Sequence, residues 1–181
     1  MDDMILVKPD LSMAEEIMEY KKEFLAADSS MDGTTPLRTC ETAEQWLEII
    51  GRMENPETVP AHWVPSTQYV YLRKSDNRIV GMIQLRHELN EYLHSFGGHI
   101  GYSVRPSERK KGYAGRMLAA FLPICREMKL GRVLITCATD NEASRRTIIK
   151  NGGVYENTVF DPEDQSNTER YWIDLQHGRM K

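Results

Sequence analysis

Apolar and polar residues recur along this chain with two periods, one typical of helices and one typical of strands. A period of three to four predicts amphipathic helices; they cover residues 13–26, 41–53, 112–129 and 141–150. Shorter alternating or β-branched runs predict strands; these cover residues 4–7, 67–73, 78–86, 99–104, 132–138, 154–160 and 170–175. The expected order is therefore β-α-α-β-β-β-α-β-α-β-β.

This order predicts an α/β (α+β) fold with a central mixed, mostly antiparallel sheet flanked by helices. Residues 67–86 read as an antiparallel hairpin, and 99–138 read as a β-α-β crossover. Residues 54–66 contain three prolines and no periodicity, so we expect a loop there. The length of 181 residues suits a single domain spanning residues 1–181.

Composition narrows the classes of partner. Lys and Arg number 23 against 27 Asp and Glu, a net charge of −4, which gives no global attraction for nucleic acid or an anionic membrane. The longest apolar run, 117–125, is too short to cross a bilayer, and the N-terminal residues do not resemble a signal peptide. No two of Cys40, Cys125 and Cys137 form a C-x-x-C pair. Reduced cysteines and a cytoplasmic location are expected.

The turn between the strand ending at Val104 and the helix beginning near Gly112 has an unusual composition. Small residues at 112, 114 and 115 allow a ligand to approach the backbone, where the first N–H groups of the helix have no intrahelical partner. Basic side chains crowd the same turn against the single acid Glu108; they are Arg105, Arg109, Lys110, Lys111 and Arg116. This combination predicts a site for a diphosphate.

Other ligand-binding patterns are missing from the sequence. There is no G-x-G-x-x-G or G-K-S/T motif, so neither a dinucleotide fold nor a Walker loop is indicated. His87-Glu88 lacks the second histidine of H-E-x-x-H, and His87, His94 and His99 lack a metal-ligand spacing. We therefore expect no metal.

The segment Arg109-Lys-Lys-Gly112-Tyr-Ala114 resembles the Q/R-x-x-G-x-G/A motif of the GNAT superfamily of N-acetyltransferases, in the same strand–turn–helix context. A second likeness is the strand that ends in Thr136-Cys-Ala-Thr-Asp-Asn141 and leads into a helix. The resemblance covers residues 67–175, the expected acetyl-CoA-binding core. Residues 1–66 match only the outline of the family's variable N-terminal part.

This resemblance implies transfer of the acetyl group of acetyl-CoA directly to a primary amine. Coenzyme A is the implied cosubstrate, with the strand around Ser103 and Val104 along the pantetheine arm. The implied cofactor-binding residues are Ser103, Val104, Arg109, Lys110, Lys111, Gly112, Tyr113, Ala114, Gly115, Arg116, Asn141 and Ser144.

The acid that protonates the leaving thiolate departs from the family pattern. Many members carry a tyrosine where this sequence has Ile148. Tyr102, His99 and Tyr155 are the candidate substitutes, although each could equally be a packing residue. The missing tyrosine also keeps an alternative open, a degenerate domain that binds acyl-CoA as a regulatory module.

The sequence determines the acceptor of the acetyl group least well. Asp161, Glu163 and Asp164 lie together in the loop joining the last two strands, and Trp63 offers an aromatic face in the proline-rich loop. Both features suit a cationic amine. A small molecule and a peptide both remain open as acceptor, and so does the oligomeric state, a homodimer included.

Overall fold

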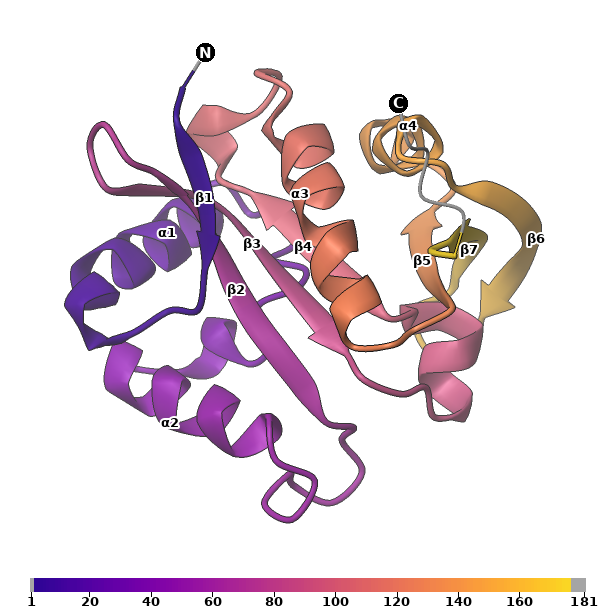
Figure 1. The fold of residues 1–181 in the computed structure, drawn as a ribbon, viewed down its shortest axis with the longest axis horizontal. Helices are drawn as coiled ribbons and strands as arrows, with labels where there is room; N and C mark the ends of the chain where they lie inside the picture. The colour runs from indigo at the N-terminus through magenta and orange to yellow at the C-terminus, as the bar shows by residue number, and fades with distance from the viewer. Residues whose placement is uncertain (1, 177–181) are drawn as a thin grey trace.

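The computed structural model describes residues 2–176, which form two adjoining antiparallel sheets with helices on both faces (Figure 1). The first sheet has the order β1-β2-β3-β4, with bounds Met4–Val7, Ser66–Arg73, Arg78–Arg86 and Ile100–Val104. The second has the order β5-β7-β6, with bounds Arg132–Ala138, Ser166–Asp174 and Val154–Asp161. The predicted order of elements and the predicted fold class are confirmed.

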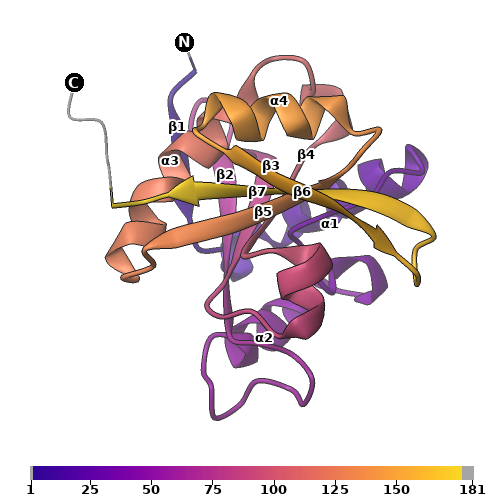
Figure 2. The same ribbon diagram turned by 90° about the vertical axis from the view of Figure 1, so that its right-hand side faces the viewer.

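The helices divide between the two faces. Helices α1 (Ala14–Ala26) and α2 (Ala43–Met53) lie on one side of the first sheet, and α3 (Tyr113–Glu127) lies on the other (Figure 1). Helix α4 (Glu142–Lys150) lies across the second sheet (Figure 2). The loops include a short π-helical turn, Leu93–Gly97, before β4.

Each face of the first sheet has its own apolar core. On the α3 side, Met117 and Phe121 pack with Ile83 and Leu85 of β3, and the same cluster extends to Ile148 of α4. On the other side, the aromatic and aliphatic residues of α1 and α2 pack against Val70, Ile79 and Met82; they include Ile17, Tyr20, Phe24, Trp46 and Ile50. Burial of these faces supplies the main favourable contribution to folding.

Two details differ from the sequence expectations. Strand β7 begins at Ser166 rather than near residue 170, because its polar first residues continue the ladder with β6. The crossover strands β4 and β5 belong to different sheets instead of pairing along their length, and this separation creates the candidate site.

Candidate functional site

Strands β4 and β5 meet at one end only. The His99 N–H donates to the Leu134 carbonyl at 2.7 Å, and the Leu134 N–H donates back to His99 Nδ1 at 2.9 Å. Beyond this junction β4 pairs with β3 and β5 pairs with β7. A gap therefore separates the two strands over the residues that follow His99 and Leu134.

The free edge of β4 presents alternate backbone groups to this gap. The Arg86 N–H donates to His99 O at 2.8 Å and the Arg105 N–H donates to Val80 O at 2.9 Å. In an antiparallel ladder the intervening odd residues face the same partner. Ser103 therefore directs its backbone groups to β3, and those of Tyr102 and Val104 face the gap. Of the two residues expected along the pantetheine arm, Val104 therefore directs its backbone groups to the gap, whereas Ser103 directs them to β3.

His99 is a buried component of the junction. Its side chain packs edge-on to Trp172 at 6.1 Å between ring centroids. Burial lowers the His99 pKa to about 4, and the positive charge of Arg86 acts in the same direction. With Nδ1 accepting from Leu134, the neutral ring holds the two sheets together, a structural role.

Tyr102 bridges the gap on the α3 side. Its hydroxyl lies 2.8 Å from Ser144 Oγ on α4. Burial raises the Tyr102 pKa to about 12, although the hydrogen bond from Ser144 opposes the change. Tyr102 is therefore protonated at neutral pH.

The other residues considered near α4 lie in three different environments: a helix cap, the core and the surface. Asn141 is the N-cap of α4, and its side-chain oxygen accepts the Ser144 N–H at 3.1 Å. Ile148 is fully buried in the core. Tyr155 is 54% exposed on β6 and its hydroxyl lies 2.9 Å from Thr158 Oγ1. The structure therefore brings together Tyr102 and Ser144, whereas the hydroxyl of Tyr155 is paired with Thr158 on its own strand, β6.

The turn predicted to bind phosphate, residues 105–112 between β4 and α3, has a backbone suited to an anion. Gly112, the N-cap of α3, has φ +77°, and Tyr113 follows as the first helical residue. A left-handed residue followed by a helical one makes a concavity of N–H groups that binds anions. No side chain caps this helix, and an added Cβ at Gly112 would meet nothing within 4 Å. Tyr113, Ala114 and Gly115 supply the first N–H groups of the helix.

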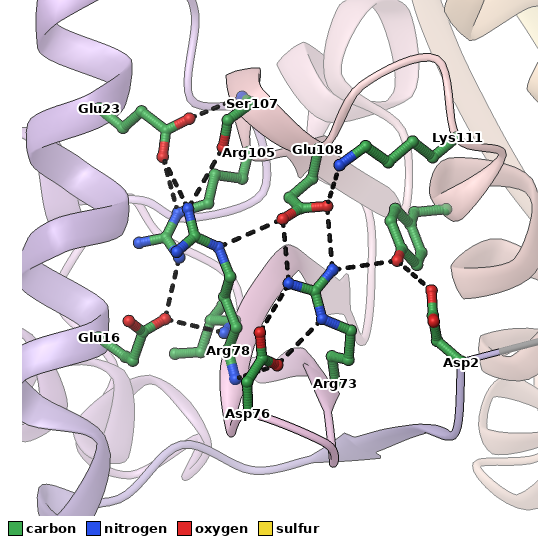
Figure 3. Close-up of polar contacts among 12 residues, drawn as sticks. Asp2, Glu16, Glu23, Arg73, Asp76, Arg78, Arg105, Ser107, Glu108 and Lys111 are labelled. Atoms are coloured by element: carbon green, nitrogen blue, oxygen red, sulfur yellow. Dashed lines mark hydrogen bonds and ion pairs between the residues drawn. The ribbon is translucent and has the colours of Figure 1, made fainter.

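The five basic residues of this turn differ in how far their charges are already paired. Arg105 is 1% exposed and forms ion pairs with Glu16 at 2.9 Å and Glu23 at 3.0 Å, away from the helix end (Figure 3). Lys110 is exposed, with φ +64°. The other three are partly engaged: Arg109 donates to Val104 O at 3.1 Å, Lys111 pairs with Glu108 at 2.8 Å, and Arg116 lies over the Tyr113 ring at 4.6 Å.

Comparison with known proteins identifies this architecture. A sequence model of the GNAT acetyltransferase domain matches residues 4–154. The chain belongs to the GNAT acetyltransferase family. The match includes most of the first sixty-six residues, beyond the part in which the sequence motifs lie. No curated protein matches the sequence significantly.

Solved structures of GNAT enzymes share the fold. A ribosomal-protein-S5-alanine acetyltransferase from Vibrio fischeri has a TM-score of 0.73 at 16% identity, over 97% of this chain and 94% of that chain. A spermidine N-acetyltransferase chimera from Vibrio cholerae and hSSAT has a TM-score of 0.67 at 17% identity, over 96% of both. RimL, a ribosomal L7/L12 alpha-N-protein acetyltransferase in complex with coenzyme A, has a TM-score of 0.70 at 18% identity, over 94% of this chain and 93% of that chain. At these identities the likeness shows the fold alone.

Two further features concern metals and membranes. Among residues 2–176, no group of three or more His, Cys, Asp or Glu side chains is arranged to hold a metal ion. Over the same residues, every helix is too short or too polar to cross a bilayer.

Sequence reasoning missed two sets of residues at this site. Asp32 lies in the loop after α1, and its carbonyl accepts the Ser103 hydroxyl at 2.6 Å. Arg73 and Arg78, from the hairpin of β2 and β3, contact Glu108 beneath the turn. Both sets lie far along the chain from the motifs, so only the paired strands bring them close.

Gly112→Asn tests the backbone concavity. Asparagine tolerates the left-handed conformation, so we expect a change in unfolding free energy of no more than about 1 kcal/mol. The added side chain lies where a diphosphate approaches, so affinity for coenzyme A should fall at least tenfold. Gly152→Asn is the matched control, because Gly152 also has a positive φ and open space around its Cβ. Calorimetry that shows equal affinity in both variants would contradict the site.

His99→Asn tests the structural role of His99, because the asparagine oxygen can replace Nδ1 as an acceptor. The lowered pKa means that the unfolded chain binds a proton between pH 6.5 and about 4 that the folded protein does not. Stability should therefore fall by up to about 3 kcal/mol as pH drops through this range.

Urea titrations between pH 6.5 and about 4 should show a smaller loss of stability at acidic pH in His99→Asn than in the wild-type protein. The exposed His62 provides the control variant His62→Asn, which should follow the wild-type curve. Equal pH dependence in all three proteins would exclude this role for His99.

Proposed function

We propose that this protein is an acetyl-CoA-dependent N-acetyltransferase that transfers the acetyl group directly to a primary amine. One observation carries the proposal: a free strand edge leads from the His99–Leu134 junction to an uncapped helix end with basic side chains. A pantetheine arm carries amide groups and ends in a diphosphate. The strand edge and the helix end supply complementary partners for these two parts.

In this arrangement the backbone groups of Tyr102 and Val104 bind the amides of the arm. The N–H groups at the start of α3 bind the diphosphate, with Arg109, Lys110, Lys111 and Arg116 supplying positive charge. The acetyl thioester then lies near Tyr102 and Ser144. A backbone N–H at this edge can polarise the thioester carbonyl.

The chemistry needs two proton movements. The acceptor nitrogen attacks the thioester carbon, the carbon–sulfur bond breaks, the amine loses a proton and the thiolate gains one. Tyr102 is the candidate acid for the thiolate, and its hydrogen bond with Ser144 orients the hydroxyl. His99 is disfavoured by its engaged Nδ1 and Tyr155 by its exposed position on β6.

The acceptor is proposed to be a cationic amine. Asp32 is exposed beside β4, and its charge opposes the lowering of the Arg86 pKa by burial. Glu163 and Asp164 are exposed in the loop between β6 and β7. Burial is the main cause of a raised pKa at Tyr92, and the acidic residues of this loop raise that pKa further. The loop therefore lies within electrostatic reach of Tyr92, in the segment before β4. Asp161 is buried and accepts the Glu163 N–H at 2.9 Å, so it shapes the turn.

A binding module without catalysis is the second candidate, favoured by the buried Ile148. Release of free thiol from acetyl-CoA separates the two functions. An amine that accelerates release above the protein-only rate supports the enzyme. Tight binding of acetyl-CoA without acceleration by any amine in a broad panel supports the module.

Tyr102→Phe is expected to lower kcat by about 100-fold to 10,000-fold, a range typical of losing a general acid. Affinity for coenzyme A should stay within twofold, because the backbone of β4 is unchanged. Tyr155→Phe removes a hydroxyl at an exposed position and should retain wild-type kcat. Steady-state kinetics with both variants provide the measurement, and wild-type turnover in Tyr102→Phe would remove its proposed role.

Acceptors with a second positive charge are expected to have lower KM values than matched monoamines, an advantage that shrinks with added salt. Asp32→Asn should raise KM for a diamine severalfold with little change for a monoamine. Glu48→Gln, on the exposed side of α2, is the charge-matched control. Preference for neutral or anionic acceptors at low ionic strength would rule out the cationic assignment.

A further inference from the structure

A buried carboxylate lies directly beneath the phosphate-binding turn. Glu108 is 5% exposed and contacts three cations (Figure 3). Arg73 Nη1 lies 3.1 Å from Glu108 Oε2, Arg78 Nε lies 3.3 Å from Oε1, and Lys111 Nζ lies 2.8 Å from Oε2. A negative charge at this place is unexpected for a site that binds a diphosphate.

Glu108 is ionised at neutral pH. Burial raises the pKa of its carboxyl, but the hydrogen bonds from Arg73 and Lys111 outweigh this effect and hold the pKa below its usual value. A buried charge of this kind persists in a fold only when it is paired. Its partners come from the hairpin of β2 and β3 and from the turn itself.

The same network reaches the first residue of α3. Arg73 binds Asp76 at 2.8 Å and donates to the Tyr113 hydroxyl at 3.2 Å. Arg78 donates to Ser107 Oγ at 3.3 Å. The turn is therefore tied on both sides of Glu108 to a rigid hairpin (Figure 3).

Within the turn, the Glu108–Lys111 contact spans Lys110, which has φ +64°. A left-handed conformation is unfavourable for lysine, so neighbouring contacts must maintain it. The ion pair closes the turn over this residue and leads the chain into Gly112. It thus fixes both the backbone conformation before the concavity and the place of one cation beside it.

We propose that Glu108 is a positioning residue for the diphosphate of the acetyl donor, and that Arg73 and Arg78 neutralise its charge so that it does not repel that group. The proposal rests on the proposed function. Glu108 does not touch the donor; it acts through Lys111 and through the conformation of residues 109–112.

Repulsion by Glu108 and positioning by Glu108 predict opposite effects of Glu108→Gln on the affinity for coenzyme A. If Glu108 only repels phosphate, then removing its charge tightens the binding of coenzyme A. If it positions the turn, the same change weakens binding. We expect KM for acetyl-CoA to rise about tenfold, the equivalent of about 1.4 kcal/mol for one weakened charge-assisted contact.

The comparison donor is S-acetylpantetheine, which has the thioester and both amides but no diphosphate. Glu108→Gln should leave kcat/KM for this donor within twofold of wild type. A loss of general stability would lower activity with both donors equally. A loss confined to acetyl-CoA therefore indicates a defect in positioning the diphosphate rather than a defect in stability. Glu19→Gln, which removes an exposed carboxylate paired with Lys22 at 3.1 Å, is the matched control and should change neither donor.

Two further variants complete the test. Glu108→Asp keeps the charge but shortens the reach to Lys111, so KM for acetyl-CoA should again rise. Pure repulsion predicts no change in KM for this variant. Glu108→Asp also tests the proposal if Glu108→Gln does not fold. Combining Glu108→Gln with Lys111→Met should add little to the effect of Lys111→Met alone.

Unchanged or lower KM in both Glu108 variants, or equal losses with the two donors, would overturn the proposal. Failure of the proposed function is distinguishable, because the wild-type protein would then show no amine-dependent release of free thiol from acetyl-CoA.

Discussion

The unpaired edge of β4 is the constraint on which the rest of the site depends. Backbone N–H and C=O groups need hydrogen-bond partners, and after His99 this strand has neighbours on one side only. The same divergence fixes the helices, because α3 follows β4 and α4 follows β5 along the chain. Both helices therefore begin at the open end of the gap. A ligand that pairs with the edge also meets the start of α3.

Charge is organised in two layers around that helix end. The inner layer pairs acids with arginines around two buried side chains, Glu108 and Arg105 (Figure 3). The outer layer consists of basic side chains near the uncapped N–H groups. Because the inner pairs are neutralised among themselves, the outer cations act on an incoming anion without strong opposition from below. The favourable local field exists despite a net charge of −4.

The sequence predicted the elements well, because strand and helix periodicity are local properties. It also singled out the turn before α3, where composition and backbone conformation coincide within a few residues; binding of a diphosphate there stays a prediction. It could not assign Arg105, whose partner Glu16 lies 89 positions away on α1. The same limit applies to Asp32, whose carbonyl accepts the Ser103 hydroxyl although the two residues lie 71 positions apart. Contacts between distant segments depend on the packing of α1 and the hairpin against β4, which periodicity does not encode.

The missing tyrosine on α4 shows that a tyrosine hydroxyl can reach the gap between β4 and β5 from either side, from α4 or from β4. Ile148 is closed in by the chain after α4, since a Cβ on Gly153 would lie 2.4 Å from Ile148 Cγ2. The hydroxyl at α4 comes instead from Tyr102 across the gap. Strand β4 then supplies both the edge that would hold the donor and the acid that would protonate its sulfur. Because both sit on one short strand, their relative position depends on fewer packing contacts than if the acid came from α4.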